Sequence, residues 1–486
     1  MTREIDQSPL FLALDQGGHA SRAMVFNQYG ETLAESSQPI HTKRYDDCVE
    51  LDAHKVTESL LKAIMLVAQQ LGEQSHRITS AALATQRSNM LCWRRSSGQA
   101  LSPILSWQDR RAESRLVGMD KKIIHQKTGL FSNAHYGASK MAWCLENIES
   151  VKQAALEDDL YIGPMASYLA SCLTGSPPLA DPSNASRTLL WNIEKRDWDD
   201  ELCQWFGIER ENLPRCVNSN HGFGMMKLGN THTIPLALVT GDLAAAAFAN
   251  GWPKQNLAYI TLGTGAFVQR INSQRFSHPR LLSGMLMVME DKQYISMEGT
   301  VNGAGSAIDW LASEQNIDAE QIINHLPEWL QQNQKQNPPA FINAVSGLGS
   351  PVWCAHAQSS FEFDSNLAAN AISLVESIVF LLALNIQTME ECLPPPVEIV
   401  ISGGLAQIDE ICQRLADITS KPVRRYPETE ATAKGLAFLL SINKSRWKTS
   451  PSVVFDAISN TGLEQRFTHW LEFMRQELTG SCLYFD

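Results

Sequence analysis

Two aspartates lie where a carboxylate could take part in chemistry. Asp15 ends the apolar run 10–14 and is followed by Gly17 and Gly18. A carboxylate beside a glycine turn suits a hydrated Mg²⁺ that bridges the phosphates of ATP. Asp242 follows Gly241 and precedes an alanine-rich, helix-like segment. It could be a general base that takes a proton from an attacking hydroxyl, or only the N-cap of that helix.

Four glycine-rich turns accompany these aspartates, and three of them directly follow apolar strands. They are Gly17-Gly18, Gly263-Thr264-Gly265, Gly303-Ala304-Gly305 and Gly403-Gly404. Turns without Cβ atoms let backbone N–H groups approach phosphate oxygens. One such turn is weak evidence, but the set beside Asp15 is stronger. None matches GxxxxGK[ST], and no GxGxxG stands between a strand and a helix, which disfavours a Walker-type NTPase and a Rossmann dehydrogenase.

Charged and aromatic residues follow two further strand candidates. Arg87 comes shortly after the apolar run 79–84, which makes it a candidate for binding substrate hydroxyls. Trp107 could stack on a carbon chain or could simply be a core residue. Arg110 and Arg111 are interpreted as charges of a solvated loop.

The elements that position these residues repeat between the two halves of the chain. Apolar runs at 10–14 and 257–262 each lead into a glycine turn and a second strand candidate. Asp52 is expected to cap a helix whose apolar stripe runs from Val56 to Leu71. The repeat predicts a duplicated α/β architecture, with domains at 1–245 and 246–486.

Composition restricts the class of protein. The formal net charge of −12 argues against a nucleic-acid or anionic-membrane partner, which would need a basic face. No signal-peptide pattern opens the chain, and the longest apolar stretch, 378–384, is too short to span a bilayer. The ten cysteines form no CxxC pair and indicate free thiols in a reducing compartment. A cytoplasmic location is therefore expected.

Short motifs occur in a fixed order along almost the whole chain, from Leu12 to about Ile442. They include Ala13-Leu14-Asp15-Gln16-Gly17, Gln86-Arg87, Trp107-Gln108-Asp109-Arg110-Arg111, Asn184-Ala185-Ser186-Arg187-Thr188, Gly241-Asp242, Gly263-Thr264-Gly265, Gly403-Gly404 and Ala433-Lys434-Gly435. The ordered set resembles the FGGY carbohydrate kinase family, and within it the glycerol kinase branch. The resemblance implies an ATP-dependent kinase that phosphorylates a hydroxyl of a small polyol or sugar. It also implies two actin-like (ribonuclease H-like) ATPase domains with the active site in the cleft between them.

The resemblance further implies roles for single residues. Asp242 would be the catalytic base, and Asp15 would organise Mg²⁺, with the two facing each other across the cleft. The acceptor would be bound mainly in the N-terminal domain, by Arg87, Ser88, Trp107, His135, Asp242, Leu243 and Phe267. ATP would be bound by Gly17, Gly18, His19, Arg22, Gly263, Thr264, Gly305, Asp309, Gly404 and Ile408.

Several positions depart from the pattern of glycerol kinase. Gly18-His19 replaces two threonines, and Ser88, His135, Leu243 and Ile408 replace Glu, Tyr, Gln and Asn. A site that binds hydroxyls discriminates through such polar contacts, so their loss predicts a changed acceptor, such as a larger polyol or a ketose. His232-Thr233 stands where the family's regulatory loop carries Arg, which predicts no control by fructose bisphosphate through that loop.

Two alternatives to an active kinase remain open from the sequence. The lost hydroxyls and acceptor contacts would also fit a sugar or nucleotide sensor that keeps the fold without turnover. An actin-like chaperone or filament would need extra peptide-binding or polymerising elements, and the sequence has none. The resemblance is compatible with a homodimer or homotetramer, although a single sequence indicates no interface.

Overall fold

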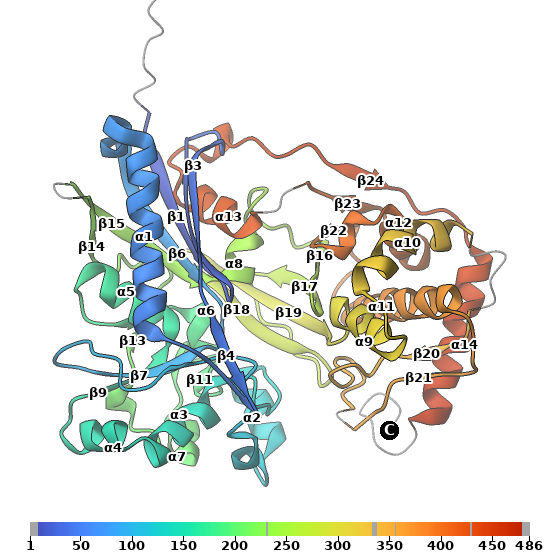
Figure 1. The fold of residues 1–486 in the computed structure, drawn as a ribbon, viewed down its shortest axis with the longest axis horizontal. Helices are drawn as coiled ribbons and strands as arrows, with labels where there is room; N and C mark the ends of the chain where they lie inside the picture. The colour runs from blue at the N-terminus through green and yellow to red at the C-terminus, as the bar shows by residue number, and fades with distance from the viewer. Residues whose placement is uncertain (1–7, 230–231, 333–337, 355, 428–429, 479–486) are drawn as a thin grey trace, which may run out of the picture. The chain divides into compact units, whose positions relative to one another are not determined.

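The computed structural model describes residues 8–478, except 230–231, 333–337, 355 and 428–429. The chain forms two compact units (Figure 1). Unit 1 contains Met1–Pro253, Gly284–Ile295 and Glu430–Thr449. Unit 2 contains Lys254–Ser283, Ser296–Thr429 and Ser450–Asp486.

Unit 1 is built on a six-stranded mixed sheet with the order β14-β15-β6-β1-β2-β3. These strands are β1 (Leu10–Gln16), β2 (Ala20–Phe26), β3 (Thr32–Pro39), β6 (Ile78–Thr85), β14 (Met225–Leu228) and β15 (His232–Gly241). β1, β6 and β15 run parallel to one another, whereas β2, β3 and β14 are each antiparallel to their neighbours. The sequence repeat predicted β1, the glycine turn and the returning strand β2 correctly.

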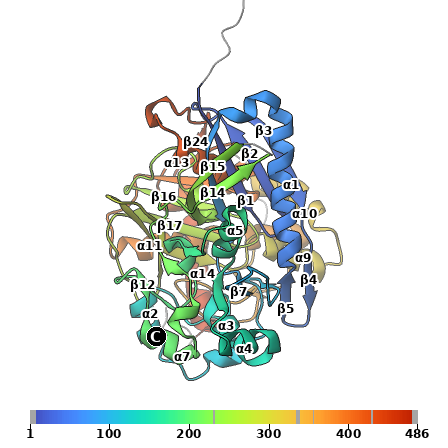
Figure 2. The ribbon, with the colours of Figure 1, turned by 90° about the vertical axis from the view of Figure 1, so that its left-hand side faces the viewer.

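Helices cover both faces of this sheet. Successive side chains of β1 point to opposite faces and therefore pack into different apolar cores. Leu12 and Leu14 belong to the apolar core that includes α1 (Ala53–Leu71) and α5 (Met165–Thr174). Ala13 belongs to a different core, with α8 (Asp242–Ala246) and α13 (Ala431–Leu440). α1 lies along β2 and β3 (Figure 2). Asp52 caps α1, as expected, by accepting from the N–H groups of His54 and Lys55.

A second sheet in unit 1 supports the loops that carry the aromatic candidates. Its order is β4-β5-β8-β7-β9. The strands are β4 (Thr42–Tyr45), β5 (Cys48–Leu51), β7 (Met90–Arg94), β8 (Ile104–Leu105) and β9 (Leu160–Pro164). α3 (Gly137–Asn147) packs against β7, and the short α6 (Pro182–Ala185) packs against β15 of the main sheet.

The sheet of unit 2 has seven strands in the order β18-β19-β17-β16-β22-β23-β24. They are β16 (Leu257–Leu262), β17 (Ala266–Asn272), β18 (Leu282–Val288), β19 (Gln293–Val301), β22 (Glu398–Ser402), β23 (Val423–Arg425) and β24 (Val453–Phe455). Residues 284–295, which include most of β18, the turn after it and the start of β19, belong to compact unit 1. The helices that bear on the site are α9 (Gly305–Glu314), α11 (Leu367–Glu390) and α12 (Asp409–Thr419).

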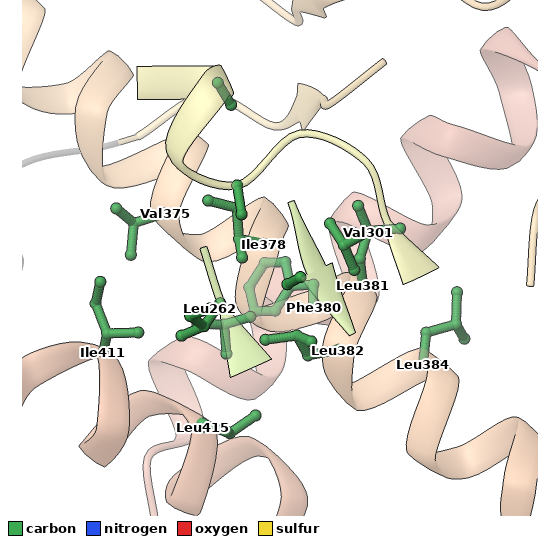
Figure 3. Packing of buried hydrophobic residues seen from close by; sticks show 14 of the residues in the cluster. Leu262, Val301, Val375, Ile378, Phe380, Leu381, Leu382, Leu384, Ile411 and Leu415 are labelled. Carbon is green, nitrogen blue, oxygen red and sulfur yellow. The ribbon is translucent and has the colours of Figure 1, made fainter. Parts of the chain in front are cut away.

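α11 is the central helix of unit 2. Its residues Val375, Ile378 and Leu382 share one apolar core with Leu262 of β16 and Leu415 of α12 (Figure 3). The apolar stretch 378–384, which is too short to span a bilayer, is part of this longer helix. By length and composition alone, the whole helix could cross a membrane. However, 89% of its most apolar window is buried within the protein, as in a core helix.

The compact units do not coincide with the expected segments 1–245 and 246–486. α13 lies in the second segment but packs against β1, β6 and α8. A Cβ on Gly435 would come within 1.9 Å of the carbonyl oxygen of Ala245, so the contact depends on glycine there. Unit 1 is therefore completed by a segment from late in the chain. The two-segment division stays a prediction about family-type domains.

Candidate active site

The sheet of unit 1 brings the two aspartates to one edge. In the parallel register, Asp15 of β1 and Thr240 of β15 both lie opposite Ala84 of β6. Neighbouring strands are about 4.8 Å apart, so the ends of β1 and β15, which lie on either side of β6, are about 10 Å apart. Both aspartates therefore lie at the same edge of the unit 1 sheet, and their facing each other across a cleft stays a prediction.

Asp15 lies in a negatively charged environment. Only 6% of it is exposed, and burial together with the nearby charge of Asp242 raises its pKa to about 7. Nη1 of Arg22 lies 3.6 Å from Oδ2 of Asp15 and 3.5 Å from Oε2 of Glu430. Glu430 raises the pKa of Asp15 further, and Arg22 opposes the rise. Two neighbouring carboxylates and one guanidinium act on Asp15, and a cation would stabilise its ionised form.

Asp242 is the first residue of α8 rather than its cap. Gly241 is the N-cap, and Oδ1 of Asp242 accepts a hydrogen bond from the N–H of Leu243 at 2.7 Å. The N-cap alternative for Asp242 is therefore wrong. Burial raises the pKa of Asp242, while the charges of Arg87 and Arg187 oppose the rise.

Arg87 approaches the backbone just before Asp242. A Cβ on Gly241 would lie 2.5 Å from both Cγ and Cδ of Arg87, so glycine is what permits this contact. Arg87 is 9% exposed and follows the end of β6. Arg87 thus lies next to the peptide that precedes Asp242, and its predicted role in binding a substrate hydroxyl stays a prediction.

Two residues that support Asp242 were missed in the sequence. The N–H of Gly241 donates to Oγ of Ser183 at 2.6 Å, and Ser183 donates to Oδ2 of Asp181 at 2.6 Å. Asp181 caps α6, whose first position is Pro182. Asp followed by Pro is a known helix-start signal, but it does not reveal that the helix start holds the peptide before Asp242.

The first glycine turn joins β1 to β2. The N–H of Gly17 donates to the carbonyl of Ala20 at 3.0 Å. A Cβ on Gly18 would meet the side-chain amide of Gln86, with Nε2 at 2.8 Å, so the loop lies close to the end of β6. His19 is exposed, and its carbonyl accepts from the N–H of Ile40.

Short contacts connect the acceptor candidates Ser88, Trp107 and His135, with Asn89 as the link between Ser88 and Trp107. Ser88 is 1% exposed and has a left-handed φ of 67°. The next residue, Asn89, accepts at Oδ1 from the N–H of Trp107 at 2.8 Å. The rings of Trp107 and His135 are 5.2 Å apart at 46°. Leu243 is half-buried beside Asp242.

Arg110 and Arg111 differ from one another. Arg110 is exposed and pairs with Glu113, as expected of a loop charge. Arg111 is 7% exposed and pairs with Asp109 and Glu50, both at 2.7 Å. The interpretation of Arg111 as a solvated charge is wrong, because Asp109, which is fully buried, holds it inside. An i, i+2 spacing of charges in a loop gives no sign of burial.

The glycine turns of unit 2 meet at one edge of its sheet. A Cβ on Gly403, whose φ is 107°, would lie 2.1 Å from the carbonyl oxygen of Leu262. The carbonyls of Gly263 and Thr264 accept from the N–H groups of Gly305 and Ser306, both at 3.0 Å. The second, third and fourth glycine turns therefore form one connected group.

The remaining nucleotide candidates have different surroundings. Gly404 is exposed, with a φ of −62°, and no atom lies within 4 Å of where its Cβ would be. Asp309 is exposed on α9, whereas Ile408 is 9% exposed and belongs to the apolar core. Phe267, predicted to line the acceptor pocket, lies half-buried on β17 opposite Thr261 in unit 2.

The side chains near Asp15 determine whether a metal ion could bind there. Within the residues that the structure describes, no group of three or more His, Cys, Asp or Glu could hold a metal by itself. Mg²⁺ in nucleotide sites is usually held by one or two carboxylates together with phosphates and water. Asp15, with its excess of neighbouring negative charge, fits that pattern.

The arrangement of strands and glycine turns defines the fold class of the protein. Each unit carries a strand, a glycine turn and a returning strand, followed by a third strand parallel to the first. This duplicated α/β pattern is that of actin-like ATPases, the fold class expected from the sequence. Residues 10–249 match the N-terminal domain of the FGGY family of carbohydrate kinases, and residues 258–443 match its C-terminal domain. The chain belongs to the FGGY family of carbohydrate kinases.

Individual relatives agree with this family. The chain is 31% identical to glycerol kinase of Geobacter sp. (strain M21), covering 96% of each protein. It is 30% identical to glycerol kinase of Citrifermentans bemidjiense, covering 96% of this chain and 95% of the relative. Both the family resemblance and the glycerol kinase branch seen in the motifs are confirmed.

Solved structures confirm the fold class. Plasmodium falciparum glycerol kinase with ADP superposes with a TM-score of 0.88 at 22% identity, covering 97% of this chain and 98% of that one. Xylulose kinase from Rhodospirillum rubrum gives 0.85 at 15% identity, covering 96% and 98%. At these identities the likeness concerns the fold alone.

Proposed function

We propose that this protein transfers the γ-phosphoryl group of ATP to a hydroxyl of a small polyol or ketose, and that glycerol is not its best acceptor. The observation that carries the proposal is the pair of carboxylates at one sheet edge of unit 1, the buried Asp15 and the half-buried Asp242. The membership of the chain in a carbohydrate kinase family supports the same reaction class.

Asp242 would activate the acceptor. Its carboxylate accepts the proton of the acceptor hydroxyl while that oxygen attacks the γ-phosphorus, and the bond from this phosphorus to the oxygen of ADP breaks. The products are ADP and a phosphate monoester, with the proton left on Asp242. Arg87 and Arg187 favour the ionised carboxylate that this step needs, against the effect of burial. Ser183 and Asp181 hold the preceding peptide of Gly241.

Asp15 would hold Mg²⁺, directly or through water. When bound, the ion would neutralise charge on the phosphates of ATP. Without the ion, Asp15 shares its surroundings with Asp242 and Glu430, and Arg22 partly offsets the effect of their charge on Asp15. Arg22 is 43% exposed at its side chain and could therefore also serve a phosphate group.

The nucleotide would be bound mainly by backbone groups of unit 2. Gly404 supports this assignment, since neither its φ nor any neighbouring atom requires glycine there. The close approach of a ligand is a remaining reason for a residue without a Cβ. Turnover would require both units to act on the same pair of substrates, which remains a prediction.

Three positions support a changed acceptor. Ser88, His135 and Leu243 stand where the glycerol kinase pattern has Glu, Tyr and Gln. A buried serine has a shorter side chain than glutamate and carries no charge, so one strong contact to a hydroxyl of glycerol would be lost. Relatives of this fold include kinases named for glycerol, xylulose and gluconate, so the fold accommodates different acceptors.

The test is ATP consumption with a panel of triols, longer polyols and ketoses, with the phosphorylated product identified by mass spectrometry. We expect turnover with at least one longer polyol or ketose, at a kcat/KM above that for glycerol. Glycerol as the best acceptor would disprove the changed acceptor. Calorimetric binding of a sugar or nucleotide without turnover on any acceptor would favour the sensor alternative.

A further inference from the structure

Lys140 of α3 is a buried amine that joins two loops. It is 0% exposed, and its Nζ donates to the carbonyl oxygen of Ser106 at 3.0 Å and to that of His135 at 2.8 Å. Ser106 follows β8, and His135 precedes α3. One side chain therefore bonds to two segments that are 29 residues apart in the chain.

The two loops carry the aromatic acceptor candidates. Ser106 is directly followed by Trp107, and the rings of Trp107 and His135 are 5.2 Å apart. Oδ1 of Asn89, which follows Ser88, accepts a hydrogen bond from the N–H of Trp107 at 2.8 Å. Lys140 itself is fully buried, with its amine bonded to these two loops.

We propose that Lys140 is a positioning residue for the acceptor: by bonding to the carbonyls of Ser106 and His135 it sets the spacing of the Trp107 and His135 rings. This inference rests on the proposed function, because those rings are assigned to the acceptor pocket there. It assigns no chemical step to the amine.

The chemistry of the site suits a lysine. Burial lowers the pKa of Lys140 to about 7, an effect that Asp109 and Cys144 oppose and that Arg111 reinforces. Above that pH the amine is neutral and has two N–H groups, one for each carbonyl. An apolar residue of similar length would fill the same volume, but it would leave the two loops without a shared donor.

Lys444 provides a matched control in the same unit. Its half-buried Nζ donates to the carbonyls of Phe438, Leu439 and Ser441 at 2.6–2.9 Å, at the end of α13. Burial lowers its pKa to about 8. It resembles Lys140 in donating hydrogen bonds to backbone carbonyls, but it is less buried and none of those carbonyls belongs to an acceptor loop.

The experiment compares Lys140→Met with Lys444→Met, using the acceptor preferred by the wild type. We expect Lys140→Met to raise KM for the acceptor about tenfold, the effect of one or two lost hydrogen bonds, with KM for ATP nearly unchanged. Lys444→Met should lower the melting temperature without changing KM for the acceptor. Equal effects of the two variants on KM for the acceptor, or a loss at Lys140 confined to melting temperature, would overturn the proposal.

Two further variants keep the proposal testable if Lys140→Met does not fold. Lys140→Gln keeps an NH₂ donor group on a shorter side chain and should give an intermediate KM. Lys140→Ala should regain acceptor affinity when propylamine is added, whereas Lys444→Ala should not change its acceptor affinity. Absence of both the intermediate effect and the amine rescue would overturn the assignment.

A failure of the proposed function would look different. If the wild type turned over no acceptor, the same variants would be compared by calorimetry with the polyols or ketoses that it binds. Weaker binding by Lys140→Met alone would then support the positioning role in a protein without turnover. A wild type that binds no polyol or ketose would overturn both proposals.

Discussion

The sheet edges of the two units share a frame but present different chemistry. In unit 1, β1 pairs with β2 and runs parallel to β6; in unit 2, β16 pairs with β17 and runs parallel to β22. The edge of unit 1 carries the side chains of Asp15, Arg87 and Asp242. The edge of unit 2 carries three glycine turns that pack on one another through backbone atoms.

This difference suggests a division of labour within one repeated architecture. Charged side chains can be exchanged for neutral ones of the same shape, so substitutions in unit 1 should change rates more than folding. Glycine turns pack backbone against backbone, so substitutions in unit 2 should change folding, nucleotide affinity, or both. The four predictions below test this contrast, beginning with the largest expected effect.

Asp242→Asn should reduce kcat by about 10²–10⁴-fold, the usual contribution of a general base. The amide has the same shape but cannot take the proton of the acceptor. The measurement is kcat at saturating ATP and acceptor, with melting temperature as a check on folding. Asp120→Asn is a control, because Asp120 is an exposed helix cap and Asn caps equally well. A kcat unchanged by Asp242→Asn would remove the base assignment.

The adjacent glycines of unit 2 should separate folding from nucleotide binding. Gly403→Ala should destabilise unit 2 by about 1–3 kcal/mol, because its φ is 107° and its Cβ would meet the carbonyl of Leu262. Gly404→Ala should change stability by less than about 0.5 kcal/mol and raise KM for ATP about tenfold through a clash with the ligand. Urea unfolding and initial rates measure the two effects. Normal ATP affinity in Gly404→Ala would show that this position does not touch the nucleotide.

Ser88→Glu should improve kcat/KM for glycerol about tenfold, since a carboxylate would restore a charged hydrogen bond to a hydroxyl. The same change should lower activity on the acceptor that the wild type prefers. Ser88→Gly is the control: it suits the φ of 67° but adds no hydrogen-bonding group. If both variants changed glycerol use equally, loop flexibility rather than the carboxylate would be responsible.

The smallest predicted effect is on the pH dependence of kcat, which should reflect the pKa of Asp242 and the charges of the arginines near it. Burial raises the pKa of Asp242, and a base must be deprotonated, so activity should fall as pH decreases through a value above the ordinary Asp pKa of about 3.9. Arg87 and Arg187 lower this pKa. Their replacement by Met should move the acid limb to higher pH, more for Arg87 than for Arg187. An acid limb that moved to lower pH would contradict the charge assignment.

The sequence by itself determined the family, the fold class and the identity of the main chemical groups. Asp15, Asp242 and most of the glycine turns were recognisable because they follow apolar strand candidates, a pattern local to a few residues. The helix cap at Asp52 and the first β-meander were predictable for the same reason. Local backbone preferences decide these features before the chain is packed.

Only the tertiary structure decided how these groups are combined. Asp15 and Asp242 share one edge because β6 sets the register of both β1 and β15, which are distant in sequence. Arg111 and Lys140 are buried because neighbouring segments close over them, and Ile408 joins the core rather than an exposed loop. Burial and long-range register depend on contacts between segments far apart in the chain, and such contacts leave no local pattern in the sequence.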